Sequence, residues 1–223
     1  MKKKLIVALD FESAELALNL LEKLDPQKCL VKVGLELFIS EGWKVLDIIS
    51  EKGFEIFLDL KLHDIPNTVA NSVRKISNFN VALTTIHLSG GKEMIEAASL
   101  EKGNIKILGV SILTSLSKND ILEITLTEFD NYFNNLISIA TNTNIDGVVC
   151  SPNELDKLKN FNKLKVVPGI RNDISDDDQK RVMSSIEAYQ KGADFIVVGR
   201  PITKSKDPRK ALELFLWNLT HLL

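Results

Sequence analysis

The stretch FLDLKLHDIPNT, residues 57–68, opens as a buried strand but carries charge to its end. Four ionisable side chains follow its apolar start within a short distance: Asp59, Lys61, His63 and Asp64. Residues 59 and 61 are two apart, so in a strand both side chains point to the same face. Burying either charge without a partner would cost on the order of several kcal/mol. Each therefore needs an opposite charge or a ligand, and a purely structural salt-bridge network is the alternative to a functional site.

Similar apolar, β-branched runs recur along the whole chain, and most are followed by a helical pattern. Candidate strands cover residues 5–10, 29–34, 55–61, 81–88, 105–113, 147–151, 165–170 and 195–200. Because these runs are almost continuously apolar, they are typical of parallel strands covered by helices on the outside. Strands and helices alternating in this way predict a closed (β/α)8 TIM barrel, with residues 1–223 as a single domain. An open doubly wound sheet is the rival, but no GxGxxG follows a strand.

The segments between the strands carry helix signals. Leucines in residues 14–24 are spaced to form one face of a helix, and Ser151 begins a capping motif, SPNE, that predicts a further helix. Asp207 precedes a proline and is expected to cap the last helix. The connection over residues 114–131 is expected to be long and irregular, which makes it a candidate lid over the site.

Composition narrows the functional class. The chain has 223 residues, a formal net charge of -2 and no long basic run, which argues against a nucleic-acid binder. No apolar run reaches membrane-spanning length, and the apolar part of the N-terminal MKKKLIVALD is too short for a secretory signal. The two cysteines, Cys29 and Cys150, lie in apolar runs and have no metal-ligand spacing, so we expect buried thiols and a cytoplasmic location.

Polar residues occur near the ends of most candidate strands. The polar positions are Asp10, Lys32, Asp59, Lys61, His87, Thr114, Arg171 and Arg200, with Pro168 and Gly199 close to the two arginines. In a (β/α)8 barrel the carboxyl ends of the strands build the active site, so these residues are candidates for it. Taken singly, Asp10 also suits a helix cap, Lys32 a lysine whose ammonium reaches solvent, and His87 a structural histidine. His63 suits a structural or an exposed position.

Two glycine- and arginine-containing turns predict a phosphate site. VVPGIR places Gly169 and Arg171 after the seventh candidate strand, and VVGRPI places Gly199 and Arg200 after the eighth. Barrels commonly bind phosphate with the loops after these two strands. Glycine lets the backbone approach the ligand, and arginine binds phosphate with two parallel hydrogen bonds. The alternative is two tight turns with solvated arginines.

These motifs together resemble one known family. DLKLHDIPNT (59–68) resembles the signature of the orotidine 5'-phosphate decarboxylases, in their compact bacterial form. The family's other motifs match in order at VALD (7–10), KVG (32–34), LTS (113–115), PGIR (168–171), DDQ (177–179) and VVGRP (197–201). The DxKxxD core is shared by a superfamily of sugar-phosphate barrels, whereas the extended motif is more specific. The resemblance covers essentially the whole chain.

The resemblance implies a reaction and a catalytic set. The reaction is the decarboxylation of orotidine 5'-monophosphate to uridine 5'-monophosphate, the last step of de novo UMP synthesis, without a cofactor or a metal. Lys61 is implied as the proton donor, with Asp59 against the substrate carboxylate. In the implied array the two lysines, Lys32 and Lys61, alternate with the two carboxylates, Asp59 and Asp64. In the family the equivalent of Asp64 reaches into the other subunit's site, so a homodimer is implied.

The resemblance also implies the residues that hold the substrate. They are Asp10, Lys32, Asp59, Ile65, Pro66, Asn67, Thr68, Thr114, Pro168, Arg171, Gln179, Gly199 and Arg200. Asp10 and Thr68 are implied at the ribose hydroxyls and Thr114 at the pyrimidine. The phosphate is assigned to Arg171, Gln179, Gly199 and Arg200.

Two other functions compete with this hypothesis. Related sugar-phosphate enzymes use a magnesium ion held partly by a glutamate near the end of the second strand, a position that Lys32 takes here. An ammonium there disfavours a divalent metal. A non-catalytic phosphate- or nucleotide-binding barrel is the second alternative, although such a protein has little use for two lysines alternating with carboxylates.

Overall fold

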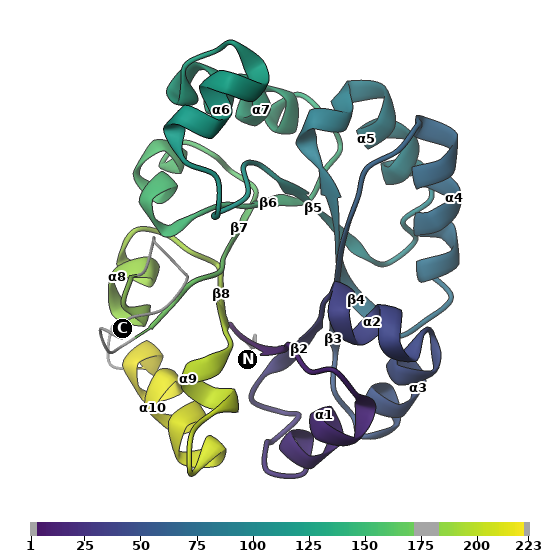
Figure 1. Cartoon of the computed structure of the whole chain (residues 1–223), viewed down its shortest axis with the longest axis vertical. Coiled ribbons are helices and arrows are strands. Elements are labelled where there is room, and N and C mark those ends of the chain that lie inside the picture. The colour runs from purple at the N-terminus through teal and green to yellow at the C-terminus, as the bar shows by residue number, and fades with distance from the viewer. Residues whose placement is uncertain (1–3, 172–182, 221–223) are drawn as a thin grey trace.

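The charged stretch of residues 57–68 runs from one strand of a closed barrel of eight parallel strands, β3 (Ile56–Leu62), into the first turn of helix α4 (Pro66–Ile76) (Figure 1). The structure, a computed structural model, describes residues 4–171 and 183–220, with side chains described as far as Trp217. Each strand pairs with the next one along the chain, and the eighth closes the ring by pairing with the first. Helices surround the ring on the outside. The predicted (β/α)8 barrel is confirmed.

The strands follow the predicted runs closely. Their bounds are β1 (Leu5–Leu9), β2 (Leu30–Val33), β3 (Ile56–Leu62), β4 (Val81–His87), β5 (Lys106–Val110), β6 (Gly147–Val149), β7 (Leu164–Val167) and β8 (Phe195–Val198). The α-helices are α1 (Ala14–Leu21), α2 (Leu35–Glu41), α3 (Lys44–Glu51), α4 (Pro66–Ile76), α5 (Gly91–Leu100), α6 (Lys118–Thr125), α7 (Phe129–Thr141), α8 (Ser185–Gln190), α9 (Arg200–Thr203) and α10 (Pro208–Thr220). Two short 3-10 helices are η1 (Leu88–Gly90) and η2 (Pro152–Leu158).

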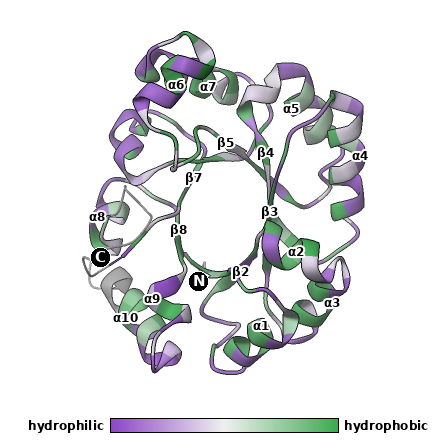
Figure 2. Ribbon diagram, in the orientation of Figure 1, coloured by the Kyte–Doolittle hydropathy of each residue, from purple (hydrophilic) through white to green (hydrophobic). Residues whose placement is uncertain are grey.

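The strands separate two apolar cores. The larger core lies between the strands and the helices, and Figure 2 shows hydrophobic and hydrophilic residues alternating along those helices. The smaller core fills the barrel interior with Ile6, Ala8, Leu30, Phe57, Leu83, Leu108, Val166 and Val197. Because side chains alternate between the two faces of a strand, every second residue faces the interior. On each strand, alternate residues therefore belong to the interior core, and the residues between them belong to the outer core.

On four neighbouring strands, the interior-facing residue that follows the apolar layer towards the carboxyl end is polar. Two residues beyond an interior apolar residue on β1, β2, β3 and β4 come Asp10, Lys32, Asp59 and Thr85. The sequence thus places a polar layer on top of an apolar one, inside the same barrel. This layer forms the floor of the carboxyl-terminal mouth, where barrels of this kind keep their active sites.

The segment after β6 differs from the α-helix that its capping motif predicts. The Ser151 N–H donates to Glu154 Oε2 at 2.8 Å, as the motif requires, but η2 is a 3-10 helix. Its buried apolar residues, Pro152, Leu155 and Leu158, recur every third residue. That spacing matches the three residues per turn of a 3-10 helix, so this geometry buries all three on one side.

The connection over residues 114–131 is not irregular as predicted, because it contains helix α6 (Lys118–Thr125). Ser117 and Asp120 form a reciprocal capping box: the Ser117 N–H donates to Asp120 Oδ2 at 2.7 Å, and the Asp120 N–H donates to Ser117 Oγ at 3.2 Å. The sequence signal for this helix was therefore present in Ser-x-x-Asp. The last residues of the segment begin α7. Across the described part of the chain, no helix combines the length and the apolar character needed to span a membrane.

Candidate active site

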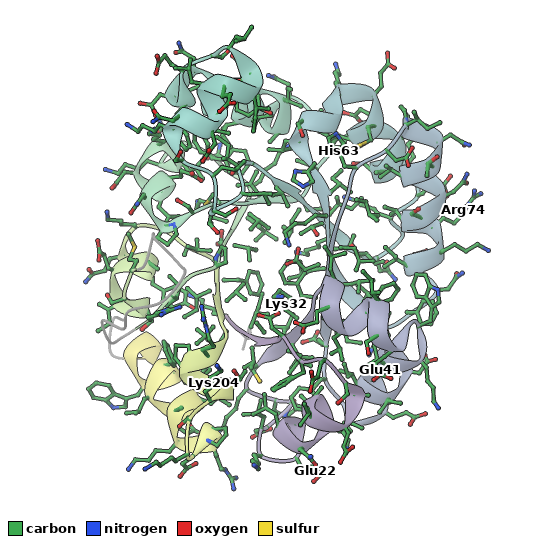
Figure 3. All side chains as sticks on the ribbon, in the orientation of Figure 1. Glu22, Lys32, Glu41, His63, Arg74 and Lys204 are labelled. Carbon is green, nitrogen blue, oxygen red and sulfur yellow. The ribbon has the colours of Figure 1, made fainter. Side chains whose placement is uncertain are left out.

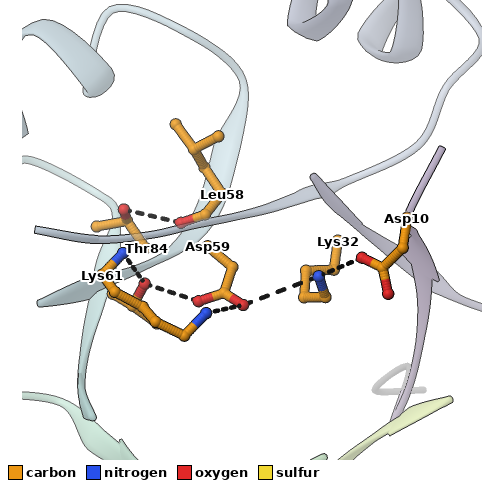
Figure 4. A network of polar contacts seen from close by, with 7 residues as sticks. Asp10, Lys32, Leu58, Asp59, Lys61 and Thr84 are labelled. Carbon is orange, nitrogen blue, oxygen red and sulfur yellow. Dashed lines mark hydrogen bonds and ion pairs between the residues drawn. The ribbon is translucent and has the colours of Figure 1, made fainter. Parts of the chain in front are cut away.

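Two lysines and two carboxylates alternate across the carboxyl-terminal mouth of the barrel (Figure 4). The Lys61 ammonium lies 2.9 Å from Asp59 Oδ2, and the Lys32 ammonium lies 3.8 Å from the same oxygen. Lys32 in turn lies 2.8 Å from Asp10 Oδ1. Figure 3 shows Lys32 inside the ring of strands, away from the outer helices. Residues on β2 and β3 and the residue after β1 thus bring four charges together, with Asp59 between the two ammonium groups and with Asp10, not the predicted Asp64, as the second carboxylate.

Burial differs sharply among these four side chains. Asp59 and Lys32 are 12% and 13% exposed, Lys61 is 31% exposed and Asp10 is 60% exposed. The shared carboxylate therefore lies deepest, and the Lys61 ammonium lies nearer the open mouth. A ligand that enters the mouth would meet Lys61 and Asp10 first.

Asp59 and Lys61 meet through an irregularity in β3. Leu58 pairs with Thr84 of β4, but Leu62 pairs with Ile86, so four steps on β3 span two steps on β4. Within this bulge Lys61 has a φ of 51°, in the left-handed region that a non-glycine residue rarely adopts. Such a conformation costs about 1–3 kcal/mol and persists only where neighbouring groups hold it. The prediction placed the side chains of Asp59 and Lys61 on one face because side chains alternate in a regular strand. In the structure the bulge, and not regular alternation, brings them together.

Thr85 is the neighbour that holds the bulge, and it was not among the residues predicted for the site. The Lys61 backbone N–H donates to Thr85 Oγ1 at 2.9 Å, and the Thr85 hydroxyl donates to Asp59 Oδ1 at 2.9 Å. Thr85 is fully buried. The available signal was its position two residues after the interior Leu83, in the same polar layer as Asp59.

The simpler alternatives for Asp10 and Lys32 do not describe this structure. Helix α1 is capped by Ser13, whose hydroxyl accepts from the Leu16 N–H at 3.5 Å, so Asp10 is not the cap. Lys32 lies in two ion pairs at the barrel mouth. A Cβ on Gly34 would come within 3.0 Å of the Lys32 ammonium, so glycine at this position leaves the lysine its room.

Asp64 and the four residues after it lie apart from this cluster. Asp64 is exposed, and its Oδ1 accepts the N–H of Ile65 at 2.7 Å. In the part of the chain that the structure describes, no ion pair joins Asp64 to Lys32 or Lys61. Ile65, Asn67 and Thr68 are exposed and Pro66 is half-buried, at the start of α4. One chain therefore assembles three of the four predicted catalytic residues.

The predicted phosphate loops follow two neighbouring strands. Arg171, after β7, is only 8% exposed, and its backbone N–H donates to the Met183 carbonyl at 3.0 Å. Gly169 in the same turn has a φ of 78°, which favours glycine. A buried Arg171 is not the solvated arginine of the simpler alternative. Gln179 lies outside the described residues.

The loop after β8 comes close to the charged cluster. Arg200 begins α9 and is half-buried, and Gly199 precedes it. A Cβ on Gly199 would lie 3.8 Å from Asp10 Oδ2, so this turn adjoins the carboxylate at the mouth. Thr114 and Pro168 are half-buried after β5 and β7. The mouth therefore combines an alternating charge cluster with two turns that contain glycine and arginine.

His87 ends β4 beside the cluster and lies next to His63. The centroids of the two rings are 5.3 Å apart. Burial lowers the pKa of His87, and the nearby His63 and the Lys61 ammonium lower it further, while Asp59 opposes the shift. His87 therefore adds a neutral imidazole to this edge of the site at neutral pH.

Comparison with known proteins identifies the family to which these features belong. A model of the orotidine 5'-phosphate decarboxylase / HUMPS family matches residues 3–215. The chain belongs to this family. An orotidine 5'-phosphate decarboxylase of Saccharophagus degradans is 43% identical over 220 residues, covering 94% of this chain and 92% of that protein. One from Wigglesworthia glossinidia brevipalpis is 38% identical over 229 residues, covering 98% of each. The family predicted from the motifs is confirmed.

Solved structures agree in architecture. The orotidine 5'-phosphate decarboxylase from Lactobacillus acidophilus has a TM-score of 0.86 and 37% identity, covering 97% of this chain and 99% of that one. The decarboxylase from Pyrococcus horikoshii OT3 has a TM-score of 0.78 at 23% identity, which shows the shared fold. The barrel of the family thus extends over essentially all of this chain.

The lowered pKa of His87 predicts how this residue titrates. We expect its ring to become protonated only below the usual pH of about 6.5, and a His63→Gln substitution to raise its pKa. Because the unfolded chain takes up this proton first, the free energy of unfolding should fall as the pH drops from about 6.5 towards the folded pKa. NMR titration of the histidine rings, assigned with His87→Gln, measures this. Protonation of His87 at or above pH 6.5 would contradict the electrostatic description.

Proposed function

We propose that this chain decarboxylates orotidine 5'-monophosphate to uridine 5'-monophosphate and CO2, the reaction for which its family is named. The observation that carries the proposal is the position of Asp59, within 2.9 Å of the Lys61 ammonium and 3.8 Å of the Lys32 ammonium at the barrel mouth. Membership of the family supports the choice of substrate. The reaction would complete the synthesis of UMP.

The chemistry calls for a positioned cation. When the bond between C6 of the pyrimidine and the carboxylate breaks, CO2 leaves and the electron pair stays at C6 in an orbital that the ring cannot readily delocalise. The Lys61 ammonium stabilises the charge that develops at C6 and then transfers a proton to that carbon. Lys61 is left neutral and regains its proton from solvent, so the cycle balances without a cofactor.

Asp59 and Lys32 prepare Lys61 for this step. Asp59 orients the Lys61 ammonium by their 2.9 Å contact, and Lys32 balances the charge of the same carboxylate. A carboxylate fixed here also faces the carboxylate of the substrate, which favours its departure as neutral CO2. In this scheme Asp10 and Thr68 bind the ribose hydroxyls, and Thr114 contacts the pyrimidine.

The phosphate is assigned to the two turns after β7 and β8. Arg171 and Arg200 supply guanidinium groups, Gly199 lets the backbone approach, and Gln179 completes the set. The other residues that we assign to substrate contact are Ile65, Pro66, Asn67 and Pro168. Because the phosphate lies far from C6, its binding energy contributes to the rate by holding the pyrimidine against Lys61.

The active enzyme is proposed to be a homodimer. Asp64 is exposed in one chain, and Ile65 beside it is 66% exposed. Leu35, Ile39 and Trp43, in and after α2, are further large apolar side chains that one chain leaves exposed. A second copy would cover apolar surface and bring its Asp64 to the charge cluster. A purified chain that sedimented as a monomer with full turnover would contradict this arrangement.

We assign the protein to the cytoplasm. Cys29 and Cys150 are both buried, no disulfide joins them, and burial raises the pKa of the Cys150 thiol. Unbridged cysteines of this kind are typical of a reducing compartment. Cell fractionation that placed the protein outside the cytoplasm would contradict the assignment.

The direct test is the ultraviolet absorbance of orotidine 5'-monophosphate mixed with the purified protein and a chelator. We expect the orotidylate signal to disappear and uridine 5'-monophosphate to form at an unchanged rate, because no step uses a metal. Activity only on a keto-sugar phosphate, and only with added magnesium, would instead favour the metal-dependent relatives. Binding of the nucleotide without turnover would favour a non-catalytic barrel.

Replacing Lys61 tests the catalytic centre. We expect Lys61→Ala to lower kcat by at least about 10²- to 10⁴-fold, because both the proton donor and the cation are lost. Lys106→Ala is the matched control, since Lys106 is exposed at the start of β5, at the opposite end of the barrel. The control should keep wild-type kinetics. A Lys61→Ala enzyme with near-normal turnover would overturn the mechanism.

Replacing Arg200 tests the phosphate assignment. We expect Arg200→Ala to lower kcat/KM for orotidine 5'-monophosphate by about 10- to 100-fold, the value of a hydrogen bond to a charged group. For the phosphate-free nucleoside orotidine, assayed at high enzyme concentration, kcat/KM should stay unchanged. Arg209→Ala, exposed on α10, is the matched control. Equal losses on both substrates would show that Arg200 does not contact the phosphate.

A further inference from the structure

The hydroxyl of Thr85 joins the two groups on which the proposed chemistry depends. It accepts the Lys61 backbone N–H at 2.9 Å and donates to Asp59 Oδ1 at 2.9 Å. Thr85 Oγ1 thus contacts both the backbone of the proposed proton donor, Lys61, and the carboxylate that orients its ammonium. The second carboxylate oxygen, Asp59 Oδ2, is the one that Lys61 and Lys32 contact.

We propose that Thr85 is a positioning residue for decarboxylation, which holds Asp59 and the strained Lys61 in the geometry required for proton transfer. The inference rests on the proposed function. Thr85 acts through its neighbours and does not itself react. Its role is to make the bulge of β3 a fixed part of the site.

A hydroxyl suits both contacts in this position. The Lys61 N–H needs an acceptor and the Asp59 carboxylate needs a donor, and a threonine hydroxyl supplies both from one atom. Because Thr85 is fully buried, water does not readily replace it. Without the hydroxyl, the left-handed backbone at Lys61 loses a hydrogen bond that holds it, and the bulge can relax.

Thr84 provides a control on the adjacent residue. It is as fully buried as Thr85, but its hydroxyl donates to the Leu58 carbonyl at 3.0 Å, before the bulge (Figure 4). Adjacent residues of a strand face opposite sides, so Thr84 faces the outer core while Thr85 faces the interior. Either substitution by isosteric valine therefore removes one buried hydroxyl from β4. Only the Thr85 hydroxyl contacts Asp59 and Lys61, so Thr84→Val controls for the general effect of losing a buried hydroxyl.

The test compares the steady-state kinetics of three variants. We expect Thr85→Val to lower kcat on the order of 10- to 100-fold with little change in KM, because a small misplacement of reacting groups slows chemistry more than it weakens binding. Thr85→Ser, which keeps the hydroxyl, should retain kcat within about threefold of wild type. Thr84→Val should also retain kcat, although it lowers the midpoint of denaturant unfolding.

A second measurement follows the geometry without activity. Relative to the other amide protons of the barrel strands, the Lys61 amide proton should exchange with solvent about tenfold faster in Thr85→Val than in wild type, and no faster in Thr84→Val. Amide exchange detected by NMR on the folded protein measures this. A purely global loss of stability would instead accelerate exchange throughout the core.

The outcomes separate the two hypotheses. Loss of kcat in Thr85→Val alone, rescue by serine and faster exchange at Lys61 would support the positioning role. An active wild-type enzyme whose Thr85→Val variant keeps its kcat, or loses no more than Thr84→Val, would overturn that role and leave the proposed function standing. A wild-type protein that left orotidine 5'-monophosphate intact would overturn both.

Discussion

The contact of Asp59 with two ammonium groups is the interaction on which the site depends. A carboxylate this deeply buried is stable because Lys61 and Lys32 lie 2.9 and 3.8 Å from one of its oxygens and the Thr85 hydroxyl donates to the other. The lysines in turn need the carboxylate, since like charges would otherwise repel each other in a narrow barrel mouth. Three adjacent strands must therefore keep their register for any of the charges to be tolerated, which couples the assembly of the site to the closure of the barrel.

A preorganised cation needs a rigid support, and the structure supplies one at a local energetic cost. Lys61 adopts a left-handed conformation inside a β-bulge, and Thr85 bridges its backbone to Asp59. Strain of this kind persists where surrounding groups over-determine the backbone, and it is common at functional sites. The Lys61 ammonium is thereby held against Asp59, and in the proposed reaction little reorganisation would remain for the chemical step.

The apolar interior and the polar mouth are successive layers of the same residue set. Phe57 and Asp59 face the same interior from one strand, as do Leu83 and Thr85 from the next. On each of these strands, the residue that packs the interior and the residue of the proposed site are therefore only two positions apart. The turns after β7 and β8 lie at the same end, where Gly199 adjoins Asp10, so the proposed phosphate turn and the charge cluster share one opening.

The barrel, its strands and the charged residues at their ends could be predicted from the sequence, because a continuous apolar run and the polar residues that end it are patterns of consecutive residues. Helix α6 and the 3-10 geometry of η2 were not predicted, although the capping box of Ser117 and the three-residue spacing from Pro152 carried signals for both. Three features could be seen only in the folded chain: the bulge at Lys61, the bridging contacts of Thr85 and the separation of Asp64 from the cluster. Each depends on how neighbouring strands pair or on what a single chain leaves exposed, and pairing register and exposure arise only when segments distant in the sequence meet.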